Sequence, residues 1–250
     1  MRRSATRGFH ATKVRRPAKV SRREAIAVLG SVGAMVAAGC SSSTPTSPST
    51  TTTGSTGTTG TGTTGSGTCS VAPNETIGPY PSLTDMVRSD IREGRAGVSL
   101  VLTIKVVNTN ANCAPVSGAA VEIWQCDSGG NYSQYGSQSG FTYLRGIQTT
   151  NAGGEVTFTT IYPGWYPGRA THIHVEVVLN GRSVKVTQIA FPESISNVVH
   201  ATLWYGNRGS NPTTNLQDNI FADSLSEELV TPAGSTTDGY AATFQCGIAL

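Results

Sequence analysis

Residues 173–191 read IHVEVVLNGRSVKVTQIAF, in which polar and apolar residues largely alternate on both sides of Asn180-Gly181. An Asn-Gly pair favours the left-handed backbone of a two-residue hairpin turn, and β-branched residues favour extended backbone. The segment therefore predicts two antiparallel strands, at 173–179 and 184–191, joined by a tight turn.

Similar runs recur along the chain, at 100–107, 120–124, 156–161 and 240–244, separated by segments rich in Gly, Asn, Pro and Ser. Helical periodicity is weak, and only 218–229 is expected to hold a turn or two of helix. We therefore predict an all-β fold, a single antiparallel β-sandwich with Gly- and Pro-rich loops and little helix. The composition agrees, because 13% charged residues with 29 Gly and 12 Pro is unlike a helix bundle or a coiled coil.

The first 40 residues are typical of an export signal. A basic region ends in Arg22-Arg23, a mild apolar run follows from Ala25 to Ala38, and small residues precede Cys40. The Arg pair resembles a twin-arginine signal, and the approach to Cys40 resembles a lipobox, in which the Cys is acylated. The alternative is an N-terminal segment that is simply cleaved, which also exports the protein.

Residues 41–68 are almost wholly Ser, Thr, Gly and Pro, without charged or large apolar side chains. Such a segment cannot bury enough surface to offset its ordering entropy, so we predict a flexible linker. The folded domain is then 69–250. We expect it to be exported to the cell envelope or beyond, with a lipid anchor at Cys40 as its only link to a membrane.

The charge balance excludes other classes of protein. After residue 40, nine Lys and Arg stand against 14 Asp and Glu, a net charge of −5. A domain with that balance has no basic surplus to place along a phosphate backbone, which argues against nucleic-acid binding. No run of about 20 apolar residues follows residue 40, which argues against a polytopic membrane protein.

Four cysteines remain in the predicted domain: Cys69, Cys113, Cys126 and Cys246. An even number in an exported protein predicts two disulfides, with three connectivities open. Cys113–Cys126 is disfavoured, because the predicted strand between them would hold the two sulfurs apart. A cysteine metal site is the alternative, and the absence of a CxxC spacing argues against it.

His172-Ile173-His174 is the clearest candidate for a metal site. In a strand, side chains two residues apart point to the same face, so both imidazoles can converge on one ion. A triad of His172, His174 and Glu176 is an alternative, but three ligands on one strand would span about 13–14 Å and could not all reach one ion. His200 is interpreted as a polar surface residue.

Three motifs point to a known family: residues 75–80 (ETIGPY), 121–132 (VEIWQCDSGGNY) and 160–174 (TIYPGWYPGRATHIH). With them, residues from about 73 to 244 resemble the intradiol ring-cleavage dioxygenases. The resemblance implies a β-sandwich that holds a non-haem Fe(III) ion between two tyrosinates and two histidines.

The implied iron ligands are Tyr132, Tyr166, His172 and His174, with Tyr166 as the tyrosinate that the substrate displaces. The resemblance further implies that Arg169 lies near the substrate ring and that Gln188 lines the same pocket. Arg169, Tyr166 and Gln188 are thus the expected catalytic residues.

The chemistry of this donor set agrees with iron. A free phenol titrates near pH 10, and only a strong local cation deprotonates it at neutral pH. Phenolate is a hard anionic donor, so two Tyr and two His favour Fe(III) over Zn(II) or Fe(II). Five further tyrosines are interpreted as core residues with the hydroxyl at the rim: Tyr80, Tyr135, Tyr143, Tyr162 and Tyr205.

The expected reaction is intradiol cleavage of a catecholic ring with O2 to a cis,cis-muconate-type product. The resemblance does not distinguish catechol, hydroxyquinol, protocatechuate and lignin-derived fragments. The chain lacks the helical N-terminal segment through which some cytosolic members dimerise, so it does not indicate the oligomeric state. Two alternatives are a cell-envelope lipoprotein that binds an aromatic ligand or iron without turnover, and a structural module on a stalk.

Overall fold

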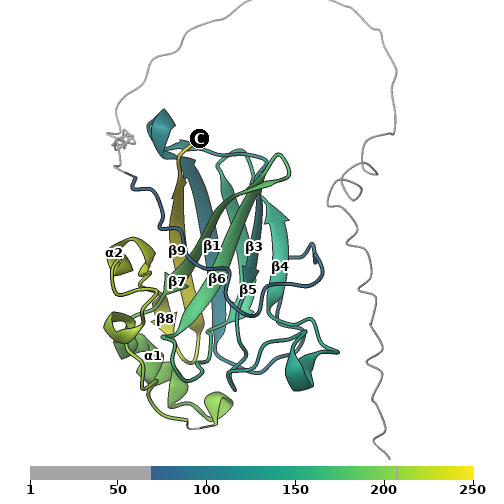
Figure 1. The fold of residues 1–250 in the computed structure, drawn as a ribbon. Coiled ribbons are helices and arrows are strands. Elements are labelled where there is room, and N and C mark those ends of the chain that lie inside the picture. Colours follow the sequence, from purple (N-terminus) through teal and green to yellow (C-terminus); the bar gives the residue numbers. More distant parts are fainter. Residues whose placement is uncertain (1–68, 207) are drawn as a thin grey trace, which may run out of the picture. The chain divides into compact units, whose positions relative to one another are not determined.

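The computed structural model describes residues 69–206 and 208–250 (Figure 1), so the predicted signal (1–40) and linker (41–68) lie outside the described residues. The strands are β1 Ser99–Asn108, β2 Ala114–Pro115, β3 Ala120–Trp124, β4 Arg145–Thr149, β5 Glu155–Ile161, β6 His172–Leu179, β7 Arg182–Ala190, β8 Ala233–Ser235 and β9 Gly239–Ile248. The α-helices are α1 Glu193–His200 and α2 Leu225–Glu228. Short 3-10 helices are η1 Thr109–Ala111, η2 Gly136–Gln138, η3 Leu203–Tyr205 and η4 Asn215–Gln217.

The strands form two sheets. One is four-stranded, in the order β4-β3-β6-β7, and the other is five-stranded, with β2-β1-β9-β8 in order and β5 paired to β1. The predicted all-β class with little helix is confirmed. The predicted hairpin is also confirmed, because β6 and β7 pair antiparallel up to Leu179 and Arg182, with positive φ at Asn180 and Gly181.

The expectation of purely antiparallel pairing is wrong at one place. Strands β1 and β9 pair in parallel, from Leu100 with Tyr240 to Asn108 with Ile248. These strands lie at opposite ends of the domain sequence, so no hairpin turn constrains their direction. The other pairings between named strands are antiparallel.

The core lies between the two sheets, which face each other in Figure 1. Alternate residues of β1 are buried, as its pattern of Leu100, Leu102 and Ile104 requires. These side chains share one hydrophobic cluster with Ile173 and Val175 of β6 in the other sheet. The alternation in the sequence therefore decides which face of each strand points inward.

Strand β6 is buried on both faces from His172 to Val177, which alternation alone does not predict. Its outer face is covered by the segment before β1, drawn in dark blue across β7 and β6 in Figure 1. The Glu75 backbone N–H donates to the Val186 backbone oxygen at 2.8 Å, and Gln188 Nε2 donates to the Thr76 backbone oxygen at 3.1 Å. This cover allows polar residues of the outer face to form a secluded site.

The prediction of two disulfides is wrong. Cys69 and Cys113 form a disulfide, whereas Cys126 and Cys246 are buried free thiols. The two thiols belong to different hydrophobic clusters, Cys246 to the core between the sheets and Cys126 to an aromatic cluster on the outer side of β3. An even cysteine count therefore did not correspond to complete pairing.

Helix α1 and strand β4 were not predicted. Helix α1 has only eight residues and follows Pro192, and its Ser196, Val199 and His200 are buried. A helix of two turns is too short to be stable alone, so packing against the sheets decides its presence. Residues 145–149 lack a clear apolar alternation, and β4 forms there because it pairs antiparallel with β3.

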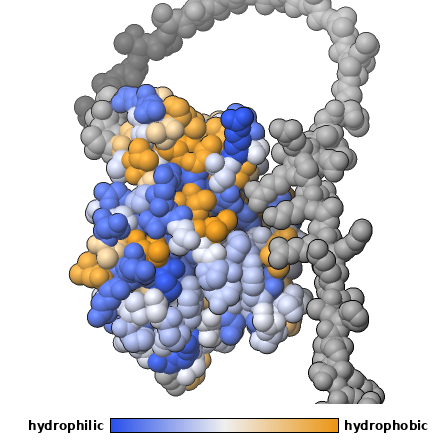
Figure 2. Space-filling model, in the orientation of Figure 1, coloured by the Kyte–Doolittle hydropathy of each residue, from blue (hydrophilic) through white to orange (hydrophobic). Residues whose placement is uncertain are grey.

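Most of the surface on the side seen in Figure 2 is hydrophilic, with the larger apolar patches toward the end of the sheets where the C-terminus lies. Within residues 69–206 and 208–250, no helix combines the length and the apolar character needed to traverse a lipid bilayer.

Candidate metal centre

Strand β6 presents two histidines on one face. His172 and His174 are two residues apart in extended backbone, so both rings leave the outer side of the sheet. Ile173 and Val175 point the other way, into the core. Both imidazoles are buried, with exposed fractions of 2% and 0%. The strand thus holds two imidazoles in a fixed relative position.

The turn after β3 delivers Tyr132. Asp127 Oδ1 accepts hydrogen bonds from the backbone N–H of Asn131 at 2.9 Å and from its side chain at 3.2 Å. Gly130 has φ +85°, and a Cβ there would lie 2.4 Å from the Trp165 backbone oxygen. The carboxylate therefore shapes the turn, and the glycine lets the neighbouring loop approach.

The loop between β5 and β6 delivers Tyr166. A Cβ at Gly164 would lie 2.2 Å from the Asp127 backbone oxygen, so glycine is required where the two loops pack. Further along, the backbone N–H of Arg169 donates to the backbone oxygen of Tyr166 at 3.4 Å, which turns the chain back toward His172. The two loops thereby bring two phenols over the same end of β6.

The four side chains meet at one point. His172 Nε2 lies 3.3 Å from the hydroxyl oxygen of Tyr132, 3.3 Å from that of Tyr166, and 3.2 Å from His174 Nε2. Ligands at about 2.0–2.2 Å from one ion lie about 3 Å from one another, so these separations suit a shared coordination sphere. His172 Nδ1 donates to the Ala170 oxygen at 2.6 Å, which leaves its Nε2 lone pair facing the other three groups.

Burial keeps both imidazoles neutral. It lowers the pKa of His172 to about 3, with a further contribution from the Arg169 guanidinium. It also lowers the pKa of His174 well below the ordinary value, and the neighbouring His172 adds to this effect. The neutral ring is the form that binds a metal ion.

Burial also favours protonated phenols. It raises the pKa of Tyr132 well above the ordinary value for a tyrosine. It raises the pKa of Tyr166 as well, although the Arg169 guanidinium opposes that change. A strong cation would be needed to draw off both protons, so this donor set fits a hard, highly charged metal ion.

Aromatic rings hold the ligands in place. Trp124 stacks on His174 with a centroid separation of 4.9 Å and an interplanar angle of 3°. Tyr80 stacks on Tyr132 at 4.6 Å and contacts Tyr166 edge-on at 6.3 Å. These contacts restrict rotation of the rings and so preserve the geometry of the site.

Arg169 and Gln188 lie beside the histidines and contact each other. Gln188 is the cross-strand partner of His174, and Arg169 Nη2 donates to Gln188 Oε1 at 2.6 Å. The structure therefore brings together all six residues singled out from the sequence. It places the guanidinium close enough to lower the pKa of both imidazoles.

The alternative ligand set of His172, His174 and Glu176 is not assembled. Within the described part of the chain, no group of three or more His, Cys, Asp or Glu side chains is placed to hold a metal ion. Glu176 lies two residues beyond His174 on β6, and its cross-strand partner on β3 is Glu122. Tyrosines, not carboxylates, therefore complete the site.

A hollow of about 210 Å³ opens beside the two phenols. It is lined by Tyr80, Gly130, Asn131, Tyr132, Tyr135, Gly136, Ser137, Gln138 and Tyr166. Tyr80 and Tyr135 pack against the buried cluster of Trp124, Cys126 and Tyr132, as core residues do, and they also line this hollow. Tyr80 ends the motif at 75–80, and its place in that motif is the signal that could have identified it.

The interpretation of His200 as a surface residue is wrong. The last residue of α1 faces the sheets, where His200 is fully buried and its Nε2 lies 3.1 Å from the Pro163 oxygen. Burial lowers its pKa. Tyr143, Tyr162 and Tyr205 are buried, as predicted.

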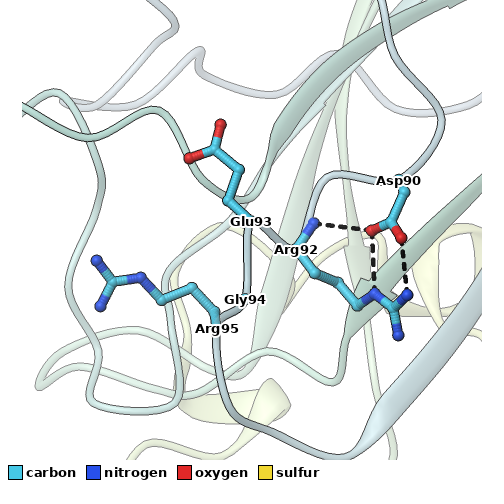
Figure 3. A pocket seen from close by; sticks show the side chains of 5 residues that line it. All are labelled: Asp90, Arg92, Glu93, Gly94 and Arg95. Atoms are coloured by element: carbon cyan, nitrogen blue, oxygen red, sulfur yellow. Dashed lines mark hydrogen bonds and ion pairs between the residues drawn. The ribbon is translucent and has the colours of Figure 1, made fainter.

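A larger hollow of about 470 Å³ lies elsewhere, lined by Asp90, Arg92, Glu93, Gly94 and Arg95 (Figure 3). Asp90 accepts hydrogen bonds at 3.0 and 2.7 Å from the Arg92 side chain, and Glu93 and Arg95 point away from that pair. Exposed ion pairs of this kind contribute little energy, and the lining provides no metal ligand comparable to the tyrosine and histidine cluster.

Residues 77–202 match the sequence profile of a family described as Dioxygenase. Over 104 residues the chain is 33% identical to catechol 1,2-dioxygenase of Candida albicans, and this aligned region covers 34% of each of the two chains. Over 117 residues it is 28% identical to hydroxyquinol 1,2-dioxygenase of Rhizobium sp., and this aligned region covers 39% of each of the two chains. The matched region thus spans little more than a third of these curated relatives.

Solved structures match over more of the chain. An intradiol ring-cleavage dioxygenase from Tetranychus urticae superposes with a TM-score of 0.65 at 34% identity, covering 72% of this chain and 95% of that one. The dioxygenase domain of a dioxygenase–carbohydrate-binding protein fusion from Streptomyces sp. SirexAA-E superposes with a TM-score of 0.56 at 30% identity, covering 72% and 99%.

Proposed function

Because the chain belongs to the intradiol ring-cleavage dioxygenase family, we propose that it opens a catecholic ring between its two hydroxylated carbons. The proposed oxidant is O2, both atoms of which enter a cis,cis-muconate-type product, and the proposed cofactor is Fe(III). The observation that carries the proposal is the meeting of two phenols and two imidazoles around His172 Nε2.

Tyr132 and Tyr166 would hold the ion through their hydroxyl oxygens, and His172 and His174 through Nε2. When bound, ferric iron supplies Lewis-acid and redox chemistry at the diol oxygens. Two tyrosinates offset two of its three charges, which makes a buried position energetically acceptable. Trp124 and Tyr80 keep the donor rings oriented by stacking on them.

Tyr166 is the proposed proton acceptor. It is less buried than Tyr132, it lines the hollow, and the Arg169 guanidinium favours its phenolate. As the diol enters, the phenolate oxygen of Tyr166 would take a proton from one catechol hydroxyl, which leaves Tyr166 as a neutral phenol and that catechol oxygen as an anion. Tyr132 is in contact with both the Tyr80 ring and the Arg145 guanidinium and stays in place.

Arg169 and Gln188 are the proposed electrostatic and orienting groups. The guanidinium is held in a defined position by its hydrogen bond to Gln188 Oε1. A preorganised cation beside the ring stabilises negative charge as it develops on the ring carbons, more than it stabilises the bound diol. Gln188 keeps that cation near the histidines.

The decisive test is an absorption spectrum of the iron-loaded protein with and without catechol. Tyrosinate-to-iron charge transfer should colour the protein, catechol should shift the band, and oxygen uptake should accompany formation of the muconate. Tyr166→Phe should alter the band and slow turnover. Tyr240→Phe is the matched control, because Tyr240 belongs to the core cluster between the sheets.

A colourless iron-loaded protein without oxygen uptake would rule out the proposed activity. A Tyr166→Phe variant with an unchanged spectrum and rate would remove Tyr166 from the ligand set. Equal losses in Tyr166→Phe and Tyr240→Phe would indicate a general effect of losing a hydroxyl.

We also propose that the domain is exported and lipid-anchored at Cys40 through residues 1–40, with 41–68 as linker. The support is the order of basic, apolar and small residues before Cys40. Changing Arg22 and Arg23 to Lys should impair export, and Cys40→Ser should move the protein from the membrane fraction to the soluble one. Unchanged fractionation of both variants would contradict the proposal.

A further inference from the structure

Asp218 is a buried carboxylate that follows η4 and lies outside the segment matched by the family profile, 77–202. Its side chain is fully buried. Oδ2 accepts from Arg169 Nε at 2.8 Å and from the Ala170 backbone N–H at 2.6 Å, and Oδ1 accepts from the Ile220 N–H at 2.9 Å. A buried charge is stable only when paired and hydrogen-bonded in this way.

These contacts determine the orientation of the Arg169 guanidinium. Its Nε–H is bound to Asp218 and its Nη2–H to Gln188 Oε1, so two donors on different nitrogens are held by partners on different parts of the chain. Gln188 Nε2 in turn donates to the Thr76 oxygen. The planar guanidinium therefore has one orientation, toward the histidine cluster.

The same carboxylate also fixes the backbone before the histidines. The Ala170 N–H donates to Asp218, and the Ala170 oxygen accepts from His172 Nδ1 at 2.6 Å. Asn211 Nδ2, also from the segment after α1, donates to the Arg169 oxygen at 2.8 Å. Residues distant in sequence thus clamp the short connection between Tyr166 and His172.

We propose that Asp218 is a positioning residue for ring cleavage, which acts by holding the Arg169 guanidinium beside the substrate ring. The proposal rests on the proposed function, because Arg169 has a catalytic role only if a catechol binds there. Without Asp218 the guanidinium would lose its charged partner and would turn away from the ring. The preorganisation that favours the transition state would then be lost.

The first test compares Asp218→Asn with Asp223→Asn. Asp223 is an exposed carboxylate five residues further on, so it controls for the change of charge in the same segment. We expect Asp218→Asn to lower kcat for catechol by about 10–100-fold and to change KM by less than about threefold, since the guanidinium acts mainly on the transition state. Asp223→Asn should resemble the wild type.

Arg169→Gln provides the test of mechanism. If Asp218 acts through Arg169, Asp218→Asn should cause no further loss of kcat in the Arg169→Gln background. Additive losses, or a wild-type kcat in Asp218→Asn, would overturn the proposal. Neither result would affect the proposed function, which fails only if the wild-type protein itself does not cleave catechol.

A measurement without iron or substrate covers the case in which Asp218→Asn does not fold. In the NMR spectrum of the metal-free wild-type protein, the Arg169 Nε–H should exchange slowly with water and resonate downfield, as a buried charge-assisted hydrogen bond requires. The exposed Arg182 is the internal reference. Exchange of the Arg169 Nε–H as fast as that of Arg182 would overturn the proposal.

Discussion

At Gly78 the segment before β1 passes directly over the His174 ring. Gly78 has φ +74°, and a Cβ there would lie 2.8 Å from His174 Cε1. Real Cβ atoms do not approach other atoms that closely, and an L side chain is strained at this φ. A single added methyl group would therefore push one imidazole out of position.

Gly78→Ala should weaken iron binding by about 10–100-fold, the usual effect of disturbing a group that orients a metal ligand. Titration of the metal-free protein with iron measures this. Gly94→Ala is the matched control, because Gly94 also has φ +74° but nothing lies within 4 Å of an added Cβ. Equal iron affinities of the two variants would show that the contact with His174 has no effect.

The residues of the site differ in how well the sequence predicted them. His172 and His174 share a face because alternation in a strand is a local property. His200 was misassigned and the place of Tyr80 beside the hollow was missed, because the surroundings of both depend on which segments fold over them. Tyr80 becomes part of the site only when the chain before β1 crosses the outer face of β6.

Among the elements, the turn at 127–132 has the clearest internal cause. Asp127 Oδ1 accepts hydrogen bonds from the backbone N–H groups of Gly129 and Asn131, both at 2.9 Å. The turn carries Tyr132 at its end and packs against the loop that carries Tyr166. Its shape therefore determines the separation of the two phenols.

Asp127→Ala should lower the free energy of unfolding by about 1–3 kcal/mol, because the N–H groups of Gly129 and Asn131 lose their charged hydrogen-bond acceptor. It should also weaken iron binding, since Tyr132 would no longer be held in place. Asp127→Asn retains an acceptor oxygen and should behave like the wild type. Urea unfolding and iron titration of the two variants check this, and equal losses in both would contradict it.

Elements with local signals were predicted and those without were not. The Asn180-Gly181 hairpin follows from turn chemistry that two residues contain. Strand β4 and helix α1 form because neighbouring strands and the core stabilise them. The parallel pairing of β1 with β9 joins the two ends of the domain and has no local signal at all.

For the whole molecule, Glu228 links stability to pH. Its side chain is buried in α2, and burial raises its pKa to about 7, with a smaller contribution from Glu75. In the unfolded chain its ordinary pKa is 4.5. The protonated side chain therefore contributes fully to the free energy of unfolding below pH 4.5, and this contribution is lost as the pH rises through about 7.

Glu228→Gln should remove this loss and raise the free energy of unfolding at pH 8, relative to the wild type, by about 1–2 kcal/mol. At pH 4 the difference should vanish. Buried neutral histidines affect stability in the opposite sense, because the free energy of unfolding falls as the pH drops below their ordinary pKa. Each variant is therefore compared with the wild type at the same pH, where this contribution is common to both. Glu227→Gln, an exposed neighbour, is the control.

A difference between Glu228→Gln and the wild type that did not change with pH would contradict this account. Urea unfolding curves at pH 4, 6 and 8 provide the measurement. An equal pH dependence in Glu227→Gln would assign the effect to net charge.

The sequence by itself determined the all-β class, the main strands, the histidine pair and the family, because alternation, turn residues and short motifs are properties of neighbouring residues. Only the tertiary structure decided that Cys69 pairs with Cys113, that β1 and β9 are parallel, and that Asp218 reaches Arg169. Such contacts join residues far apart in the chain, and they form only when burial of the shared core brings those segments together.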